Sequence, residues 1–191
     1  MIHGEKIFLR TMRDSDLDIL LEMLEDIEAR GEYYPQEMPS QVAMRKRFSE
    51  DGYWGDNFGR LLICEPDGRI VGMVHFFKEP SYFDGLELGY IMLDPAARGK
   101  GYMTEAVNLL VRYLFRVFKI NRLQILATPE NIPSWRVAEK CGFTYEGTAR
   151  GAIFNAGKMY DMKVYSLLRA EANLDGNAAL PAGDPQDDPA G

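Results

Sequence analysis

The sequence has few of the residues that build metal sites or disulfide frameworks. Its 191 residues include two cysteines, Cys64 and Cys141, and two histidines, His3 and His75. Both cysteines stand in apolar surroundings, and neither residue type shows the spacing of a zinc site. The sequence therefore predicts free, buried cysteines and no bound metal ion.

Long apolar runs and an excess of basic residues are also missing. No segment approaches the roughly 18 uninterrupted apolar residues of a membrane-spanning helix, and residues 1–10 lack the apolar core of a secretory signal. The net charge is −7, and four aspartates in residues 174–191 account for four of these charges. Such a balance argues against membrane and nucleic-acid partners but is compatible with a cationic substrate. We expect a cytoplasmic protein.

The composition predicts one domain followed by a tail. With 46% hydrophobic residues, the chain can bury one substantial core, which we expect within residues 1–173. From Leu174 onward Gly, Ala, Pro and Asp dominate. Residues 174–191 are therefore predicted to form a disordered acidic tail.

The order of apolar and turn-forming segments predicts an α/β fold. Strands are expected over residues 7–10, 61–65, 70–77, 86–93, 123–127, 143–149 and 159–167. Helices are expected from a cap at Asp14 to Ile27, around 41–48, over 103–118, and from Pro133 to Gly142. Residues 28–59 otherwise read as an irregular flap, and residues 80–85 as a turn. Antiparallel hairpins followed by one parallel strand pair predict a mixed sheet flanked by helices.

Residues 86–118 are the most informative stretch. Leu86–Leu93 is a predicted buried strand in which Glu87 is the only charge, and Asp94-Pro95 ends it. Arg98-Gly99-Lys100-Gly101 then precedes an amphipathic helix. Glycines allow a ligand to approach the backbone, the first helical turn has free N–H groups, and two basic residues add positive charge. The turn is either a phosphate site or a plain tight turn. A triphosphate site is disfavoured, because the Gly-Lys-Ser/Thr ending is missing.

Two motifs resemble the GNAT family of N-acetyltransferases. Arg98-Gly99-Lys100-Gly101 is similar to the family's Arg/Gln-x-x-Gly-x-Gly/Ala loop, and Asn131 to Phe143 resembles its second signature, Asn-x-x-Ser followed by Glu-Lys-x-Gly-Phe. The family's branch that acetylates ribosomal-protein amino termini, with its relatives acting on small amines, looks most similar. The resemblance implies the GNAT fold, a mixed and mostly antiparallel sheet that splays at its parallel pair. It also implies acetyl-CoA as co-substrate.

The resemblance further implies which residues bind acetyl-CoA. The family's last loop position is usually Gly or Ala, whereas Met103 stands here. Thr104 either contacts phosphate or occupies the first helical turn, and Asn131 either contacts the cofactor or caps a helix. Backbone N–H groups near the end of the central strand would bind the developing oxyanion. The implied set is Ile91, Met92, Leu93, Arg98, Gly99, Lys100, Gly101, Tyr102, Met103, Thr104 and Asn131.

The catalytic residues implied by the resemblance are Glu87 and Ser134. Glu87 occupies a strand position that often serves as the base in this family, directly or through water; the alternative is a solvent-facing or edge residue. Glu105 is a second candidate base, with a capping or solvated role as its alternative. Many members place a tyrosine acid seven residues after the motif's Asn, but that position is Ala138 here. Ser134 then becomes the candidate acid, or caps a helix.

The acceptor pocket is expected to draw on aromatic and acidic residues of the irregular flap, which suit a cation but are equally suited to ordinary packing. These residues are Tyr33, Tyr34, Glu37, Tyr53, Trp54 and Asp56. His75 is expected to be a core strand residue. The sequence thus predicts an N-acetyltransferase that moves the acetyl group of acetyl-CoA to a primary amine, either a small amine or polyamine or a protein amino terminus, by direct attack in a ternary complex. The alternative is a non-catalytic acyl-CoA-binding or regulatory domain, and the resemblance makes a homodimer plausible.

Overall fold

A mixed eight-stranded sheet forms the centre of the molecule. The computed structural model describes residues 1–78 and 84–174, so the predicted turn at residues 80–85 and all of the tail after Leu174 lie largely outside the described residues. Within them only β5 and β6 run parallel, in a sheet of order β1-β2-β3-β4-β5-β6-β8-β7. This confirms the predicted fold class. The strands are β1 (Ile2–His3), β2 (Phe8–Thr11), β3 (Phe58–Cys64), β4 (Ile70–Lys78), β5 (Gly85–Met92), β6 (Arg122–Ala127), β7 (Thr144–Asn155) and β8 (Lys158–Leu168).

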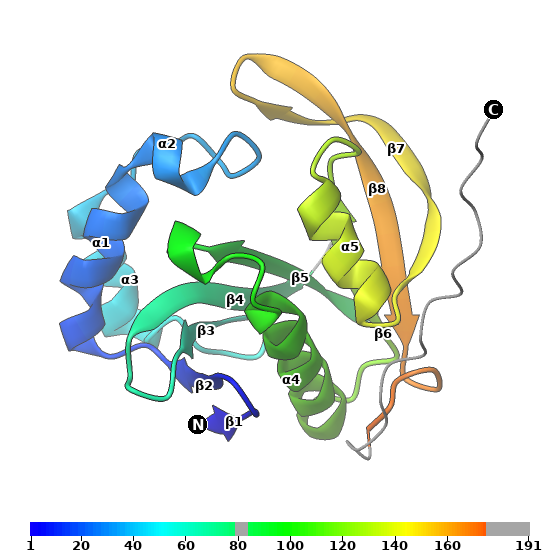
Figure 1. Ribbon diagram of the computed structural model, residues 1–191, viewed down its shortest axis with the longest axis horizontal. Coiled ribbons are helices and arrows are strands. Elements are labelled where there is room, and N and C mark those ends of the chain that lie inside the picture. Colours follow the sequence, from blue (N-terminus) through cyan, green and yellow to red (C-terminus); the bar gives the residue numbers. More distant parts are fainter. Residues whose placement is uncertain (79–83, 175–191) are drawn as a thin grey trace.

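Helices cover both faces of this sheet, with α1, α2 and α3 grouped together and α4 and α5 on the other side (Figure 1). No helix in the described part of the chain is long and apolar enough to cross a membrane. The helices are α1 (Leu17–Glu25), α2 (Ile27–Arg30), α3 (Gln41–Asp51), α4 (Tyr102–Val117) and α5 (Ile132–Lys140), and two short 3-10 turns are η1 (Asp14–Asp16) and η2 (Pro95–Ala97).

Two buried clusters, one on each face, fix which way the strand side chains point. Even-numbered residues of β5, such as Leu86 and Leu88, pack with α4 in the larger cluster, whereas Ile91 packs with α1 in the smaller one. Successive side chains of a strand alternate between faces. Glu87 and Gly89 therefore share the face of Ile91, and Tyr90 shares the face of α4.

The amino-terminal helix begins differently from the prediction. Asp14 does not cap it; instead the Arg13 N–H donates to Asp16 Oδ2 at 2.7 Å, and the Arg10 guanidinium donates to both Asp16 oxygens at 2.6 and 2.8 Å. These hydrogen bonds hold the side chain of Asp16, and residues 14–16 form the 3-10 turn η1 before α1 starts. The backbone of Asp26 is extended, so α1 ends early and Ile27 lies in α2.

The carboxy-terminal hairpin is longer than predicted. β7 continues to Asn155 through irregular pairing between Ala149 and Ile153, and a turn at residues 156–157 joins it to β8. The tip arches towards the segment after α2 (Figure 1), where Asn155 Nδ2 donates to the Glu32 carbonyl at 2.9 Å. β1 was not predicted. The other predicted strands and helices are confirmed with shifts of a few residues.

Candidate active site

The parallel strands β5 and β6 form a fork. They pair only through Gly85–Glu87 and Arg122–Gln124, whereas β5 stays paired with β4 as far as Met92. Beyond Glu87, in the described part of the chain, β5 therefore has no strand partner on its β6 side. The predicted splaying of the parallel pair is confirmed.

Glu87 lies at the last paired position, where the fork opens. Its Oε2 accepts a hydrogen bond from Gln124 Nε2 at 3.1 Å, and both side chains are half-buried. The bond crosses from β5 to β6 and orients the carboxylate. Glu87 is thus a half-buried residue of a strand in the interior of the sheet, between β4 and β6, and not an edge residue.

The register of β5 directs a row of backbone donors into the fork. The Leu93 N–H donates to the Val71 carbonyl of the β4 side at 3.0 Å. Since an antiparallel strand bonds its neighbour with alternate residues, the N–H groups of Leu88, Tyr90 and Met92 face away from β4. They point to the side on which the fork widens.

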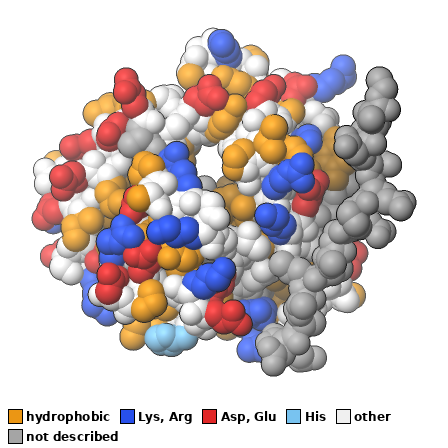
Figure 2. Space-filling model, viewed as in Figure 1, with side chains coloured by type: hydrophobic (Ala, Val, Ile, Leu, Met, Phe, Trp, Pro, Cys, Tyr) orange, Lys and Arg blue, Asp and Glu red, His pale blue; other side chains and the backbone are white. Residues whose placement is uncertain are grey.

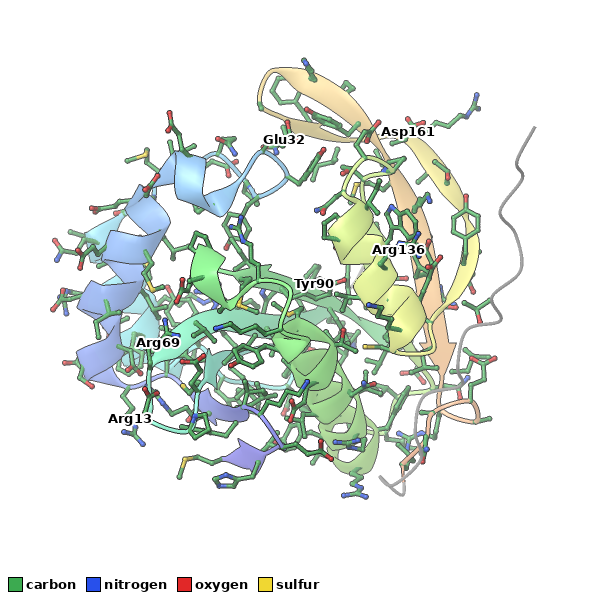
Figure 3. The ribbon with its side chains drawn as sticks, viewed as in Figure 1. Arg13, Glu32, Arg69, Tyr90, Arg136 and Asp161 are labelled. Carbon is green, nitrogen blue, oxygen red and sulfur yellow. The ribbon has the colours of Figure 1, made fainter. Side chains whose placement is uncertain are left out.

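A tyrosine that the motifs did not identify bridges the fork to α5. The Tyr90 hydroxyl donates to the Ser134 carbonyl at 2.8 Å and accepts from Ser134 Oγ at 3.2 Å; Figure 3 labels it between β5 and α5. Burial raises the pKa of Tyr90, and the hydrogen bond with Ser134 only partly opposes it. The hydroxyl is therefore protonated at neutral pH. The alternation of side chains along β5 could have indicated this contact. Tyr90 shares the strand face of Leu86 and Leu88, and that face packs against the helices α4 and α5.

The N-cap and first turns of α5 contain Asn131, Ser134 and Ala138, whose roles the sequence left open. Asn131 Oδ1 accepts the Ser134 N–H at 3.3 Å, so Asn131 caps the helix and Ser134 does not. Ala138 is fully buried in the larger core cluster. A tyrosine ring would not fit there without moving the core, so the usual acid position is closed.

The glycine-rich loop takes a shape that requires glycine. Gly99 and Gly101 have φ values of 76° and 81°, which other residues rarely adopt. Gly101 then caps α4, whose first N–H groups have no partner within the helix. Arg98 reaches back towards the Met92 carbonyl at 3.4 Å. The loop thus places backbone donors and two cations beside the open end of β5.

Ion pairs hold the base of this loop in place. Arg69 bonds to Glu65 and to Asp94, and Asp94 Oδ1 accepts the Ala96 N–H at 2.8 Å. The Tyr102 hydroxyl donates to Glu65 Oε1 at 2.9 Å. Figure 2 shows Lys and Arg side chains interspersed with acidic ones on this face.

The half-buried side chain of Thr104 lies in the first turn of α4, while its carbonyl accepts from the Cys141 thiol at 3.5 Å.

Glu105 has a structural partner. Its Oε1 accepts the N–H groups of Glu5 and Lys6, and a Cβ added to Gly4 would lie 2.0 Å from that oxygen. The carboxylate therefore fastens the turn between β1 and β2 onto α4. Lys6 is brought beside the loop, where its Nζ lies 3.4 Å from the Lys100 carbonyl.

Alanine at Gly99 or Gly101 should weaken acetyl-CoA binding by about 5- to 30-fold. A left-handed alanine costs about 1–2 kcal/mol, so the free loop relaxes and binding must restore the strained shape. Isothermal titration with acetyl-CoA measures the change. Gly157→Ala is the matched control, since its φ is 78° at the distant hairpin tip; it should lower stability and leave the affinity unchanged. Equal affinities for all three variants would contradict the loop's role.

The structure separates the residues expected to bind the acceptor. Tyr34 and the buried Tyr53 join the smaller cluster, on the face of Glu87. Trp54 does not lie with them: it packs against Phe76 and Tyr113 at ring distances of 5.6 and 5.9 Å on the α4 side. Register explains this, because Trp54 bridges to Gly59, which shares the α4-side face of Phe76.

The other flap residues are more exposed. Tyr33 is half-buried, and a hydrogen bond to Glu32 raises its pKa to about 12. Glu37 and Asp56 are exposed, and the Glu37 carbonyl accepts from Arg30 Nη1 at 3.2 Å. Figure 2 shows an opening between the segment that carries Glu32 and α5.

His75 is a half-buried residue of β4 and belongs to neither core cluster, although it was expected in the core. Its ring stacks between Phe58 and Phe77 at 6.4 and 5.9 Å. A Cβ at Gly89 would lie 2.2 Å from its Nε2, so the imidazole covers the glycine on β5. Burial and the charge of Arg60 lower the pKa of His75 to about 3, and the ring is neutral. Among the described residues no group of three or more His, Cys, Asp or Glu side chains could hold a metal ion.

Comparison with known proteins agrees with this geometry. Residues 6–144 match the sequence model of the Acetyltransferase (GNAT) domain. The chain is 30% identical over 184 residues to the probable N-acetyltransferase YjcK of Bacillus subtilis, a match that covers 90% of the chain and 98% of that protein. It is 29% identical over 175 residues to the putative ribosomal N-acetyltransferase YdaF of the same organism, covering 88% and 94%.

A solved structure shares the fold. The spermidine N-acetyltransferase of Vibrio cholerae in complex with CoA and spermine superimposes with a TM-score of 0.77, at 18% sequence identity, over 88% of this chain and 99% of that one.

Proposed function

The chain belongs to the GNAT family of acetyl-CoA-dependent N-acetyltransferases, and from this premise we propose that it acetylates a primary amine by direct attack on the thioester in a ternary complex. A neighbour carries the name of a spermidine acetyltransferase and a relative that of a ribosomal one. The proposed acceptors are accordingly small amines, polyamines or protein amino termini.

The observation that carries the proposal is the position of Glu87 at the base of the fork. Its carboxylate is held by Gln124 at the point where the strands part. An alkyl ammonium has a pKa near that of lysine, about 10, so it must lose a proton before its nitrogen can attack. Glu87 takes that proton, directly or through water. The amine lone pair then forms the C–N bond with the thioester carbonyl carbon.

The backbone of β5 stabilises the negative charge that develops on the carbonyl oxygen. The N–H groups of Leu88, Tyr90 and Met92 are directed to this side of the strand by the register. Donors that are fixed before the reaction need no reorganisation as charge develops. Ile91 and Leu93 flank this row, and their role is to hold the strand against β4.

The C–S bond then breaks, the newly bonded nitrogen loses its second proton, and the thiolate of CoA is neutralised by one proton. Ser134 Oγ, whose single proton is donated to the Tyr90 hydroxyl in the free protein, turns that proton to the sulfur, while Tyr90 stays bonded to the Ser134 carbonyl; the proton from the nitrogen then replaces the one that Ser134 gives up. A thiol has a pKa of about 8.5, so the gain from this donor is modest. Because the thiolate needs little help from an acid, the reaction does not require a tyrosine at position 138.

The glycine-rich loop holds the cofactor. The backbone from Arg98 to Thr104 offers N–H groups to the pyrophosphate, and Arg98 and Lys100 offer charge. Tyr102 and Met103 support the loop through Glu65 and the core respectively. Tyr33, Tyr34, Glu37 and Tyr53 belong to the proposed acceptor side, whereas Trp54 supports the opposite face.

Two measurements test the proposal together. Calorimetric titration should show saturable binding of acetyl-CoA and none of ATP, because the loop lacks a triphosphate cradle. Thiol release with a panel of spermidine, amino acids and a peptide with a free amino terminus should then show turnover that depends on the amine. Binding without thiol release for any amine would contradict the proposal.

Two expectations about the whole molecule belong to the same proposal. A cytoplasmic location is supported by the free, buried state of Cys64 and Cys141. The homodimer stays a prediction, and light scattering would measure it.

A further inference from the structure

Two arginines lie on the acceptor side of the sheet, on the same face as Glu87. Arg60 of β3 stands opposite His75 of β4, which in turn stands opposite Gly89 of β5. Arg30 ends α2 and is buried with 7% of its surface exposed. The charges of both act on the Tyr34 hydroxyl, where they oppose the effect of burial on its pKa. Arg30 also lies over the Tyr34 ring and Arg60 over the Tyr53 ring, and both rings belong to the smaller cluster, so the two cations lie on one side of the sheet.

Among the residues that the structure describes, neither arginine has a carboxylate partner. None of the ion pairs formed within the described residues involves Arg30 or Arg60. Arg30 Nη1 donates to the Pro35 and Glu37 carbonyls, but its Nε and Nη2 are buried without a hydrogen-bond partner, as is Nε of Arg60. Buried polar groups in native proteins are normally paired, so these donors call for a specific explanation.

Contacts with aromatic rings stabilise these two arginine charges only in part. The Arg60 guanidinium carbon lies 4.7 Å from the Tyr53 ring centroid, and that of Arg30 lies 5.6 Å from Tyr34. Contact with a ring stabilises a cation less than a well-placed carboxylate does. A guanidinium stacked on a ring keeps its N–H edge free, which is the geometry that binds a carboxylate with two hydrogen bonds.

A neighbouring arginine provides a contrast. Arg60 lies over Phe58 as well as Tyr53, at 5.8 Å from the Phe58 centroid. Arg47 lies over these same two rings, 5.2 Å from Tyr53 and 4.2 Å from Phe58, but its Nε lies 3.6 Å from Asp51 Oδ2. Its side chain is also 44% exposed. The exposed arginine thus has a carboxylate supplied by the protein, and the two more buried ones do not.

We propose that the acceptor is a small amine that carries a carboxylate, an amino carboxylic acid, and that Arg60 together with Arg30 binds this carboxylate while the amine faces Glu87. The inference rests on the proposed function and narrows it. A polyamine would instead bring positive charge beside two unbalanced cations.

The test compares each common amino acid with its carboxamide, which differs in charge and little in size, and includes spermidine as an amine without a carboxylate. For the preferred amino acid, kcat/KM should exceed that of its carboxamide by about tenfold or more, the difference expected for charge-assisted bidentate bonds. The carboxamide has more neutral amine at pH 7, so its intrinsic reactivity works against this result.

Arg60→Gln assigns the preference to the arginine. It should lower kcat/KM for the acid by about 10- to 100-fold and leave the carboxamide within about threefold. Arg47→Gln is the matched control, because it removes a cation from the same rings and should leave the acid-to-amide ratio unchanged. Thermal unfolding and acetyl-CoA titration of both variants verify that the fold and cofactor site are intact.

The outcomes separate this inference from the function on which it rests. Turnover with amines but equal use of acids and carboxamides, faster turnover with spermidine, or an equal loss for both substrates in Arg60→Gln would each overturn the carboxylate proposal alone. Binding of acetyl-CoA without turnover of any amine would overturn the acetyltransferase mechanism as well.

Discussion

Replacing Glu87 by Gln should lower kcat by about 10²- to 10⁴-fold, the range expected for loss of a general base. The amide has nearly the same size and can still bond to Gln124, which now holds the carboxylate at 3.1 Å. Acetyl-CoA binding should be unchanged, since the loop at Gly99 and Gly101 lies at the other end of the fork. Thiol release at saturating acetyl-CoA gives kcat, and calorimetry gives the affinity.

The pH profile makes this prediction more specific. The variant depends on amine that is already neutral, and that fraction rises tenfold per pH unit below an amine pKa of about 10. The difference from wild type should therefore shrink as the pH rises. A constant difference at all pH values would indicate a lost contact rather than a lost base.

Glu105→Gln is the matched control for Glu87→Gln. Glu105 was the second carboxylate that the sequence offered as a base, but its oxygen accepts backbone N–H groups of residues 5 and 6. A glutamine oxygen can accept the same bonds, so turnover should change little. Full activity of Glu87→Gln, or a large loss in Glu105→Gln, would require a different base.

Asp16→Asn should destabilise the protein by about 3–5 kcal/mol, as expected when one partner of a buried ion pair is removed. The side chains of Arg10 and Asp16 are only 10% and 6% exposed, and two hydrogen bonds join them. The substitution would leave the Arg10 cation buried without its counter-charge. Urea unfolding followed by tryptophan fluorescence measures the free energy.

Asp18→Asn provides the control on the same helix. Asp18 pairs with Arg45, but these side chains are 75% and 40% exposed. Exposed pairs contribute little, so the loss should be less than about 1 kcal/mol. If the two variants lost similar amounts of unfolding free energy, burial would not explain the contribution of the Arg10–Asp16 pair to stability.

Acid should remove the difference between wild type and Asp16→Asn. Burial by itself raises the pKa of Asp16, but the hydrogen bonds from Arg10 and Arg13 and their charges outweigh it, so the pKa is lowered. A lowered pKa contributes stability above the unfolded value, about 3.9, and this is lost as the pH falls through the folded value. The difference between the two unfolding free energies should therefore begin to shrink as the pH falls below about 4 and should vanish only below the folded-state pKa of Asp16.

Some structural features were predictable because they depend on neighbours along the chain. The turn before α4 needs glycines and free N–H groups within four consecutive residues, and Asn131 caps α5 by accepting the N–H of Ser134, three residues along the chain. The apolar run of residues 86–93 with Glu87 as its only charge was also visible in the sequence. These local features gave the fold class, the loop and Glu87.

Other features depend on register between distant strands. Trp54 was grouped with Tyr53 because they are adjacent in sequence, but consecutive residues can face opposite sides of a sheet. Tyr90 meets Ser134 across 44 residues, and Glu105 meets Lys6 across 99. No pattern within one segment contains these pairings.

The sequence by itself thus determined the order of elements, the glycine-rich loop proposed to bind acetyl-CoA and the strand that carries the proposed base, because propensity, glycine conformation and helix-end hydrogen bonding act over a few residues. Only the tertiary structure decided that Glu87 meets Gln124 where the strands part, and that Arg30 and Arg60 lie over rings of one cluster without a carboxylate partner among the described residues. Those arrangements follow from packing two helix layers onto a twisted sheet, which fixes side-chain partners across long stretches of chain.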